Sequence, residues 1–222
     1  MCGRYSLKVD PQKLAEAFAD YAEVPNNLPT RYNIAPTQDV AVIANNKRHQ
    51  VEFFRWGLIP SWAKDSSIGN RLINARSETL VEKPSFKSAY RRRRCLVLAD
   101  GFYEWRRNPN KTKTPMYIRL ASGEPFAFAG LWEAWHSPQD EFVLSCTIIT
   151  TEPNDLLETI HNRMPVILPP EAYARWLDPA ETPAQELQGL LVPYPAEEMT
   201  AFEVSTLVNS PQNDSAEVVI PV

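Results

Sequence analysis

A chain of 222 residues, with 44% hydrophobic and 23% charged side chains, can bury one substantial core, which excludes a disordered or fibrous protein. No apolar run approaches about 18 residues and no signal peptide opens the sequence, so neither a transmembrane nor a secreted protein is expected. The net charge of −4 conceals a basic half, since residues 1–120 hold 21 Lys and Arg and residues 121–222 hold only two. A basic half can attract a polyanion, although the two halves can equally attract each other within one fold.

Short apolar runs separated by turn residues recur along the chain. Many short strands at regular spacing favour a barrel-like, mostly antiparallel curved β core, and flanking helices make the fold class α+β. No linker, repeat or low-complexity segment divides the sequence, so a single domain over residues 1–222 is expected. Strands are predicted at 5–7, 40–44, 51–56, 95–98, 116–120, 126–131, 142–150, 166–168 and 199–208, helices at 11–21, 155–160, 170–177 and 184–191 (the last with a capping box at Thr182), and an irregular segment at 31–36.

Cys2, directly behind Met1, is the first candidate functional residue. Removal of Met1 would give Cys2 a free α-amine beside its thiol. The ordinary pKa values, about 7.7–8.0 and 8.5, leave a useful fraction of each group deprotonated near neutral pH. Such an aminothiol attacks an aldehyde through nitrogen and closes to a thiazolidine, or attacks an amide as an N-terminal nucleophile. The alternative is a small residue tolerated in a flexible tail.

Trp62 follows Pro60 and is therefore expected on a loop. A loop tryptophan is most often a half-buried anchor, and the alternative is a platform on which a nucleic-acid base stacks. Further along, Arg91–Arg94 form a run that is typical of a solvated face or a patch that contacts phosphates. Cys95 and Cys146 lie in buried-strand patterns and are expected to be inert core thiols.

Glu104 and His161 are candidate acid–base residues. Glu104 stands among aromatic residues, so it is either an outward-facing strand residue or a desolvated acid with a raised pKa. His161 precedes Arg163, one of the two cations of the acidic half, and the pairing is either purposeful or a surface coincidence. The three scattered histidines and the absence of a CxxC pair predict no metal site, and an odd number of cysteines indicates a reducing, cytoplasmic setting.

Taken together, several motifs resemble the SOS response-associated peptidase (SRAP) family, whose members shield abasic sites in DNA by crosslinking to them. The order and spacing of the motifs make the resemblance specific, and it covers nearly the whole chain. The motifs are Met1-Cys2-Gly3-Arg4-Tyr5, Tyr32-Asn33-Ile34-Ala35-Pro36, Trp56-Gly57 with Trp62, Asn74-Ala75-Arg76 with Glu78-Thr79, Ala99-Asp100-Gly101-Phe102-Tyr103-Glu104-Trp105, Thr150-Thr151, His161-Asn162-Arg163-Met164-Pro165 and Val208-Asn209.

The resemblance implies roles for eight residues and the kind of partner. Cys2 would be the covalent residue, Asn74 would hold the adduct, and Glu104 and His161 would move protons at the amine and the sugar. Single-stranded or junction DNA with abasic sites would be the substrate, bound by a cytoplasmic monomer without a cofactor. The residues implied to line the DNA groove are Arg4, Trp62, Arg76 and Arg163.

Two other functions compete with this interpretation. An N-terminal-cysteine amidohydrolase or peptidase would explain Cys2 but not the basic half or Trp62, and ammonia release from glutamine would identify it. A non-covalent nucleic-acid or protein binding module would leave Cys2 incidental, and would bind abasic DNA without a gain in mass.

Overall fold

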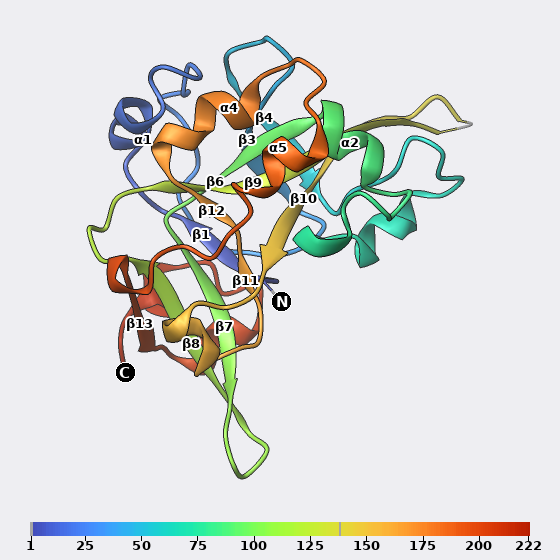
Figure 1. Ribbon diagram of the computed structural model, residues 1–222. Helices are drawn as coiled ribbons and strands as arrows, with labels where there is room; N and C mark the ends of the chain where they lie inside the picture. The colour runs from blue at the N-terminus through green and yellow to red at the C-terminus, as the bar shows by residue number, and fades with distance from the viewer. Residues whose placement is uncertain (1, 138) are drawn as a thin grey trace.

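A closed ring of five strands forms the centre of the computed structural model, which describes residues 2–137 and 139–222 (Figure 1). Around the ring each strand pairs with the next, and β9 and β10 pair to close it. All pairs are antiparallel except β4–β10, in which Cys146 lies opposite Trp56. The barrel-like, mostly antiparallel core is therefore confirmed. The ring strands are β3 (Asp39–Ala44), β4 (Val51–Trp56), β6 (Arg94–Ala99), β9 (Phe126–His136) and β10 (Phe142–Thr151).

A second, five-stranded sheet stands beside the barrel. β6 ends at Ala99 and β7 begins at Gly101, so the chain crosses between the two sheets at Asp100. The Asp100 carboxylate is 5% exposed and accepts hydrogen bonds from the Ser6 hydroxyl (2.6 Å) and the backbone N–H of Lys8 (2.7 Å). In order, the sheet contains β13 (Met199–Glu203), β8 (Lys113–Leu120), β7 (Gly101–Arg107), β1 (Tyr5–Leu7) and β2 (Arg31–Ile34).

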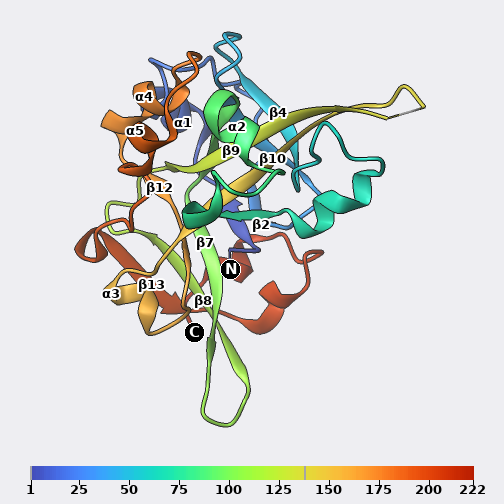
Figure 2. The ribbon, with the colours of Figure 1, turned by 45° about the vertical axis from the view of Figure 1, so that its right-hand side comes forward.

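Short helices and strands cover the two sheets. β5 adds to the edge of β10, with Ala75 opposite Ile149, and α4 packs on β6. β9 and β10 also extend well beyond the barrel as a long hairpin (Figure 2). None of the helices in the described part of the chain is long and apolar enough to cross a membrane. The remaining elements are α1 (Pro11–Ala17), β5 (Asn74–Arg76), α2 (Lys87–Arg92), α3 (Asp155–Glu158), β11 (Met164–Pro165), β12 (Ile167–Leu168), α4 (Tyr173–Leu177) and α5 (Ala184–Gln188), together with 3₁₀ turns at Ser66–Arg71, Ser77–Thr79, Pro170–Ala172, Ala196–Glu198, Thr206–Asn209 and Ala216–Val219.

Three local predictions were wrong. Residues 31–34 form β2 instead of an irregular segment, because pairing with β1 satisfies their backbone. The late strand region ends at Glu203, and residues 206–209 form a 3₁₀ turn. Thr182 does not cap α5, whose N-cap is Pro183 without a side-chain hydrogen bond; the Thr182 hydroxyl instead accepts from Arg94 (3.2 Å).

The run Arg91–Arg94 is not an open phosphate patch. Arg94 is fully buried, and its guanidinium donates to the backbone oxygens of Trp176 (2.8 Å) and Asp178 (2.6 Å). The three preceding arginines bind carboxylates, Arg91 and Arg92 at Glu181 and Arg93 at Glu133. A guanidinium with five donors can satisfy many carbonyls at once, which is why this one is tolerated inside the fold. Cys95 and Cys146 are buried core thiols, as predicted.

Gly101 lets the chain enter the second sheet beside Tyr117. A Cβ at this position would lie 2.1 Å from the Tyr117 hydroxyl, which is itself hydrogen-bonded to Ser6 (2.8 Å). Because neither group can move freely, we expect Gly101→Ala to lower the free energy of unfolding by about 1–3 kcal/mol, measured by urea denaturation. Gly189→Ala is the matched control, since a Cβ there meets no atom within 4 Å. Equal stability of the two variants would contradict the packing argument.

Candidate functional site

The pairing of β1 with β7 brings Cys2 beside Glu104. The two strands are antiparallel, with Tyr5 opposite Phe102, and the Tyr103 N–H donates to the Arg4 carbonyl (2.9 Å). The chain that precedes Arg4 therefore runs along β7 past Glu104. Cys2 is fully buried there. Removal of Met1, expected from the sequence, concerns a residue outside the described part of the chain.

Cys2 holds a neutral thiol in this environment. Burial raises its pKa far above the ordinary range, and the negative charge of Glu104 raises it further. A buried thiolate beside a carboxylate would be doubly unfavourable, because it is both desolvated and repelled. The expectation that a useful fraction of this thiol is ionised near neutral pH concerns the protein without Met1 and stays a prediction.

Asn74 binds Cys2 directly. Its Nδ2 donates to the Cys2 carbonyl oxygen at 2.7 Å, from a position on β5 that pairs with Ile148 of β10. The amide oxygen of Asn74 is buried and accepts no hydrogen bond from any of the described residues. An amide can donate and accept at once, so Asn74 anchors the Cys2 backbone and keeps one acceptor beside it.

Glu104 and His161 meet next to Cys2. The Nε2 of His161 lies 4.0 Å from a Glu104 carboxylate oxygen. Glu104 is 3% exposed, and burial raises its pKa, while the charge of His161 acts in the opposite direction. Glu104 is thus the desolvated acid, and its interpretation as an outward-facing residue is wrong.

His161 is oriented by the backbone that follows it. The imidazole Nδ1 lies 3.0 Å from the Arg163 backbone nitrogen and 3.2 Å from the Arg163 carbonyl oxygen. Nδ1 can accept from the first when neutral and donate to the second when protonated. The ring thus keeps a partner in either state, and its Nε2 stays directed at Glu104.

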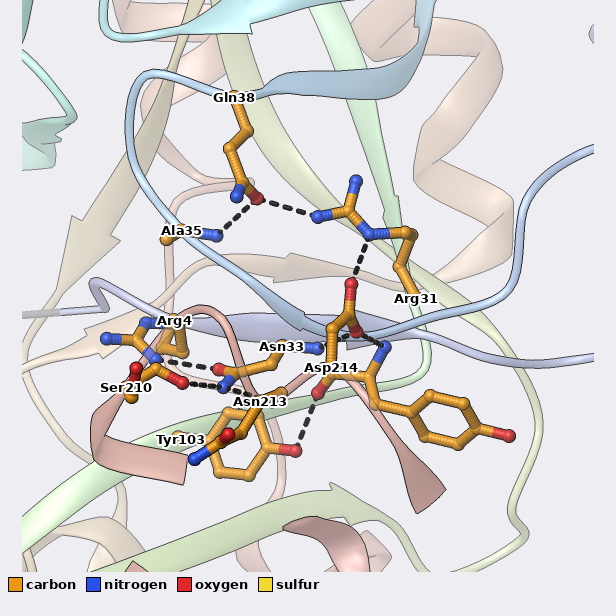
Figure 3. Close-up of polar contacts among 10 residues, drawn as sticks. Arg4, Arg31, Asn33, Ala35, Gln38, Tyr103, Ser210, Asn213 and Asp214 are labelled. Carbon is orange, nitrogen blue, oxygen red and sulfur yellow. Dashed lines mark hydrogen bonds and ion pairs between the residues drawn. The ribbon is translucent and has the colours of Figure 1, made fainter. Parts of the chain in front are cut away.

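Arg4, two residues after Cys2, is held by neutral acceptors (Figure 3). Its Nη1 donates to Asn33 Oδ1 (2.7 Å) and to the Val208 carbonyl (2.6 Å), and its guanidinium lies over the ring of Trp105 at 5.8 Å. Within the described chain no carboxylate pairs with Arg4. Its positive charge is therefore held in place without being neutralised.

A segment after β13, which we call the strap (residues 205–214), provides this support. Asn33 Nδ2 donates to the carbonyls of Val208 (3.2 Å), Ser210 (3.0 Å) and Asn213 (2.8 Å). The Asp214 carboxylate accepts from the Asn33 N–H (2.9 Å) and pairs with Arg31 (2.5 Å) (Figure 3). Asn33 was visible as part of the Tyr32–Pro36 motif, but nothing in the sequence near Asp214 indicated its role.

Arg163 has a different environment. Its guanidinium makes a two-pronged contact with Glu78 (2.6 and 3.1 Å) and donates to the Thr150 carbonyl (2.6 Å). This contact joins the segment that carries His161 to the segment that follows Asn74. The Glu78 carboxylate already neutralises the charge of Arg163. A contact of Arg163 with DNA therefore stays a prediction, and it requires Glu78 to be displaced.

Trp62 and Arg76 are the open members of the predicted groove. Trp62 is 58% exposed, so its interpretation as a half-buried anchor is wrong. The loop beneath it is held by the Trp135 indole N–H, which donates to the Ala63 carbonyl (2.8 Å). Arg76 is exposed on β5, two residues after Asn74, and has no ion pair within the described chain.

A cleft of about 480 Å³ opens beside His161. Trp105 and Arg107 form one wall of it, and residues 158–162, which include His161, form the other. No group of three or more His, Cys, Asp and Glu side chains that could hold a metal ion occurs among the described residues. The site thus combines a neutral thiol, a desolvated carboxylic acid and an oriented imidazole, with unneutralised cations nearby.

Comparisons with known proteins show the family of this chain. The abasic site processing protein YoqW of Bacillus subtilis (strain 168) is 48% identical over 221 residues, which cover 99% of each chain. The abasic site processing protein HMCES of Gallus gallus is 34% identical, over 86% of this chain and 66% of that relative. A crystal structure of a protein from Bacteroides thetaiotaomicron covers the whole of both chains with a TM-score of 0.88 at 28% identity. A family model described as SOS response associated peptidase (SRAP) matches residues 1–211, and the chain therefore belongs to the SRAP family.

Proposed function

We propose that this protein shields abasic sites by forming a covalent bond between Cys2 and the ring-opened deoxyribose of single-stranded or junction DNA. The observation that carries the proposal is the convergence of Asn74, Glu104 and His161 on Cys2 from separate parts of the chain. The relatives are named abasic site processing proteins, which supports an abasic site as the substrate. Removal of Met1, whether by the protein itself or by another peptidase, would expose the reacting amine.

The chemistry begins at the amine. An abasic sugar equilibrates between a closed hemiacetal and an open aldehyde, and His161 would transfer the proton that opens the ring. The Cys2 amine then adds to the aldehyde carbon, and the resulting carbinolamine loses water to give an imine. Both steps move protons, which positioned acids and bases typically accelerate by about 10²–10⁴-fold. Burial raises the pKa of Glu104, which favours its role in this exchange of protons.

The thiol completes the adduct. Its sulfur adds to the imine carbon, its proton passes to the nitrogen, and a five-membered thiazolidine forms. Because the thiol starts neutral, this proton must leave as the C–S bond forms, and Glu104 is the nearby base. An imine that fails to close can undergo β-elimination, which cuts the DNA strand. A weak lyase activity therefore accompanies the proposal.

DNA binding would rest on the unneutralised cations. Arg4 and Arg76 can contact phosphates without sequence preference, and the exposed ring of Trp62 can stack on a base. Arg163 would join them after leaving Glu78. A cytoplasmic monomer that acts on DNA without a cofactor stays part of this proposal.

The covalent step is tested by replacing Cys2. After incubation with abasic single-stranded DNA, intact mass spectrometry should show the protein–DNA adduct for the wild type and none that survives heating for Cys2→Ala. Cys2→Ser retains the amine and should form an imine that borohydride traps, because only ring closure is lost. Cys95→Ala is the control, since that thiol is buried in the core. A heat-stable Cys2→Ala adduct at wild-type yield would rule out the aminothiol.

The raised pKa of Glu104 predicts the pH dependence. A base is lost when the pH falls through its pKa, so the acidic limb of the crosslinking rate should lie above the usual range of a glutamate. Glu104→Gln should lower the rate about 10²-fold or more and lose that limb. Single-turnover rates across the pH range measure both effects. An identical acidic limb in the variant would assign it to another group.

Replacing Arg76 and replacing Glu78 should change the affinity for DNA in opposite directions, because Glu78 pairs with Arg163. Arg76→Gln should weaken binding to single-stranded DNA and reduce the slope of log K against log salt by about 0.7, the value for one phosphate contact. Glu78→Gln should strengthen binding, because it releases Arg163. Fluorescence anisotropy at several salt concentrations compares them. Tighter binding by Arg76→Gln, or weaker binding by Glu78→Gln, would remove these residues from the groove.

A further inference from the structure

The end of the hairpin formed by β7 and β8 projects beyond the second sheet (Figures 1 and 2). Residues 106–113, at its end, contain four cations and no acidic residue. Its tip is internally bonded, since Asn108 Nδ2 donates to the hydroxyls of Thr112 (3.0 Å) and Thr114 (2.9 Å). The end of this hairpin, residues 106–113, is therefore basic and has a defined conformation, and we call it the finger. The chemistry proposed at Cys2 uses none of its residues.

Three of the four cations are electrostatically unmatched. Arg106 lies 3.6 Å from Glu203, but Arg107, Lys111 and Lys113 are exposed and have no ion pair within the described chain. The run Arg91–Arg93 shows the contrast, because each of its arginines already binds a carboxylate. Unpaired like charges on one hairpin repel each other, and a polyanion would relieve that repulsion.

The finger is continuous with the candidate site. Arg107 lines the same cleft as His161, and Glu104 precedes it by three residues on β7. Arg107 ends β7 about 10 Å from Glu104, since a strand advances by about 3.3 Å per residue, and Lys113 lies opposite Arg107 on β8. A DNA strand that leaves His161 through this cleft would meet Arg107 and Lys113 first and Lys111, in the turn, later.

On the basis of the function proposed above, we propose that the β7–β8 hairpin is a second DNA-binding element, which holds the single strand on one side of the abasic nucleotide. The phosphates of that flank bind Arg107, Lys111 and Lys113 after the strand has passed through the cleft beside His161. These contacts carry no sequence information, and they favour abasic sites with a long single-stranded flank on that side.

The test combines a triple variant with DNA of different lengths. In the variant, Arg107→Gln, Lys111→Gln and Lys113→Gln are introduced together. A control triple variant, with Lys47→Gln, Lys83→Gln and Lys87→Gln, loses the same charge at exposed positions elsewhere. The DNA probes are a short abasic oligonucleotide, with two nucleotides on each side, and two longer ones, extended by ten nucleotides on the 5′ or the 3′ side.

On the short oligonucleotide the triple variant should lose little beyond the contact of Arg107, which lines the cleft, so its rate should fall less than on an extended oligonucleotide. With one of the two extended oligonucleotides, the DNA concentration for half-maximal rate should rise about tenfold, and its salt slope should fall by about 2, as expected for three lost phosphate contacts. The control variant should behave like the wild type. An unchanged triple variant, an equal loss on all three oligonucleotides, or a loss seen only when the extension is made double-stranded would each overturn the proposal.

A failure of the hairpin is distinguishable from a failure of the crosslinking chemistry. If the wild type forms no adduct with any abasic oligonucleotide, the proposed reaction is wrong. The hairpin is then judged by anisotropy with undamaged single strands of 5 and 15 nucleotides. The triple variant should lose more affinity for the longer strand than for the shorter one, and equal affinity of variant and wild type for the longer strand would overturn the hairpin's role.

Discussion

The buried carboxylate of Asp100 is the constraint on which the site depends. It lies where the chain passes from the barrel to the second sheet, and it binds the Ser6 hydroxyl and the backbone N–H of Lys8 and Val9. These bonds fix β1 against the start of β7. Because β1 and β7 are held in one register, the residues before Tyr5 can lie only beside Glu104. A buried acid at the crossing between the two sheets thus determines where Cys2 lies.

The fold class was predictable because each strand has a recognisable pattern in its own short stretch of sequence. Runs such as Val40–Ala44 and Cys95–Leu98 are buried along their whole length. A continuous apolar run, or an alternation of apolar and polar residues, predicts such a strand. Ring closure was not predictable in the same way. The parallel pairing of β4 with β10 joins residues about ninety positions apart, and no local pattern records it. Segment 31–34 failed for a related reason, since only its partner β1 makes it a strand.

The site was predictable as a set of residues but not as an electrostatic arrangement. Cys2, Asn74, Glu104 and His161 belong to recognisable motifs, and the contacts Asn74–Cys2 and His161–Glu104 bring them together. The sequence did not reveal that Glu78 neutralises Arg163, or that carbonyl groups of the strap hold Arg4. Charge compensation depends on which side chains meet in space, so two arginines that look equivalent in the sequence differ in their availability to an anion.

The neutral state of the Cys2 thiol has a consequence for the lifetime of the protein. Peroxides and metal ions react with thiolates, and a thiol whose pKa is raised by burial presents almost none at physiological pH. In the proposed reaction this thiol closes the adduct, so its oxidation would end the reaction. The same burial that disfavours ionisation therefore also protects the thiol against oxidation.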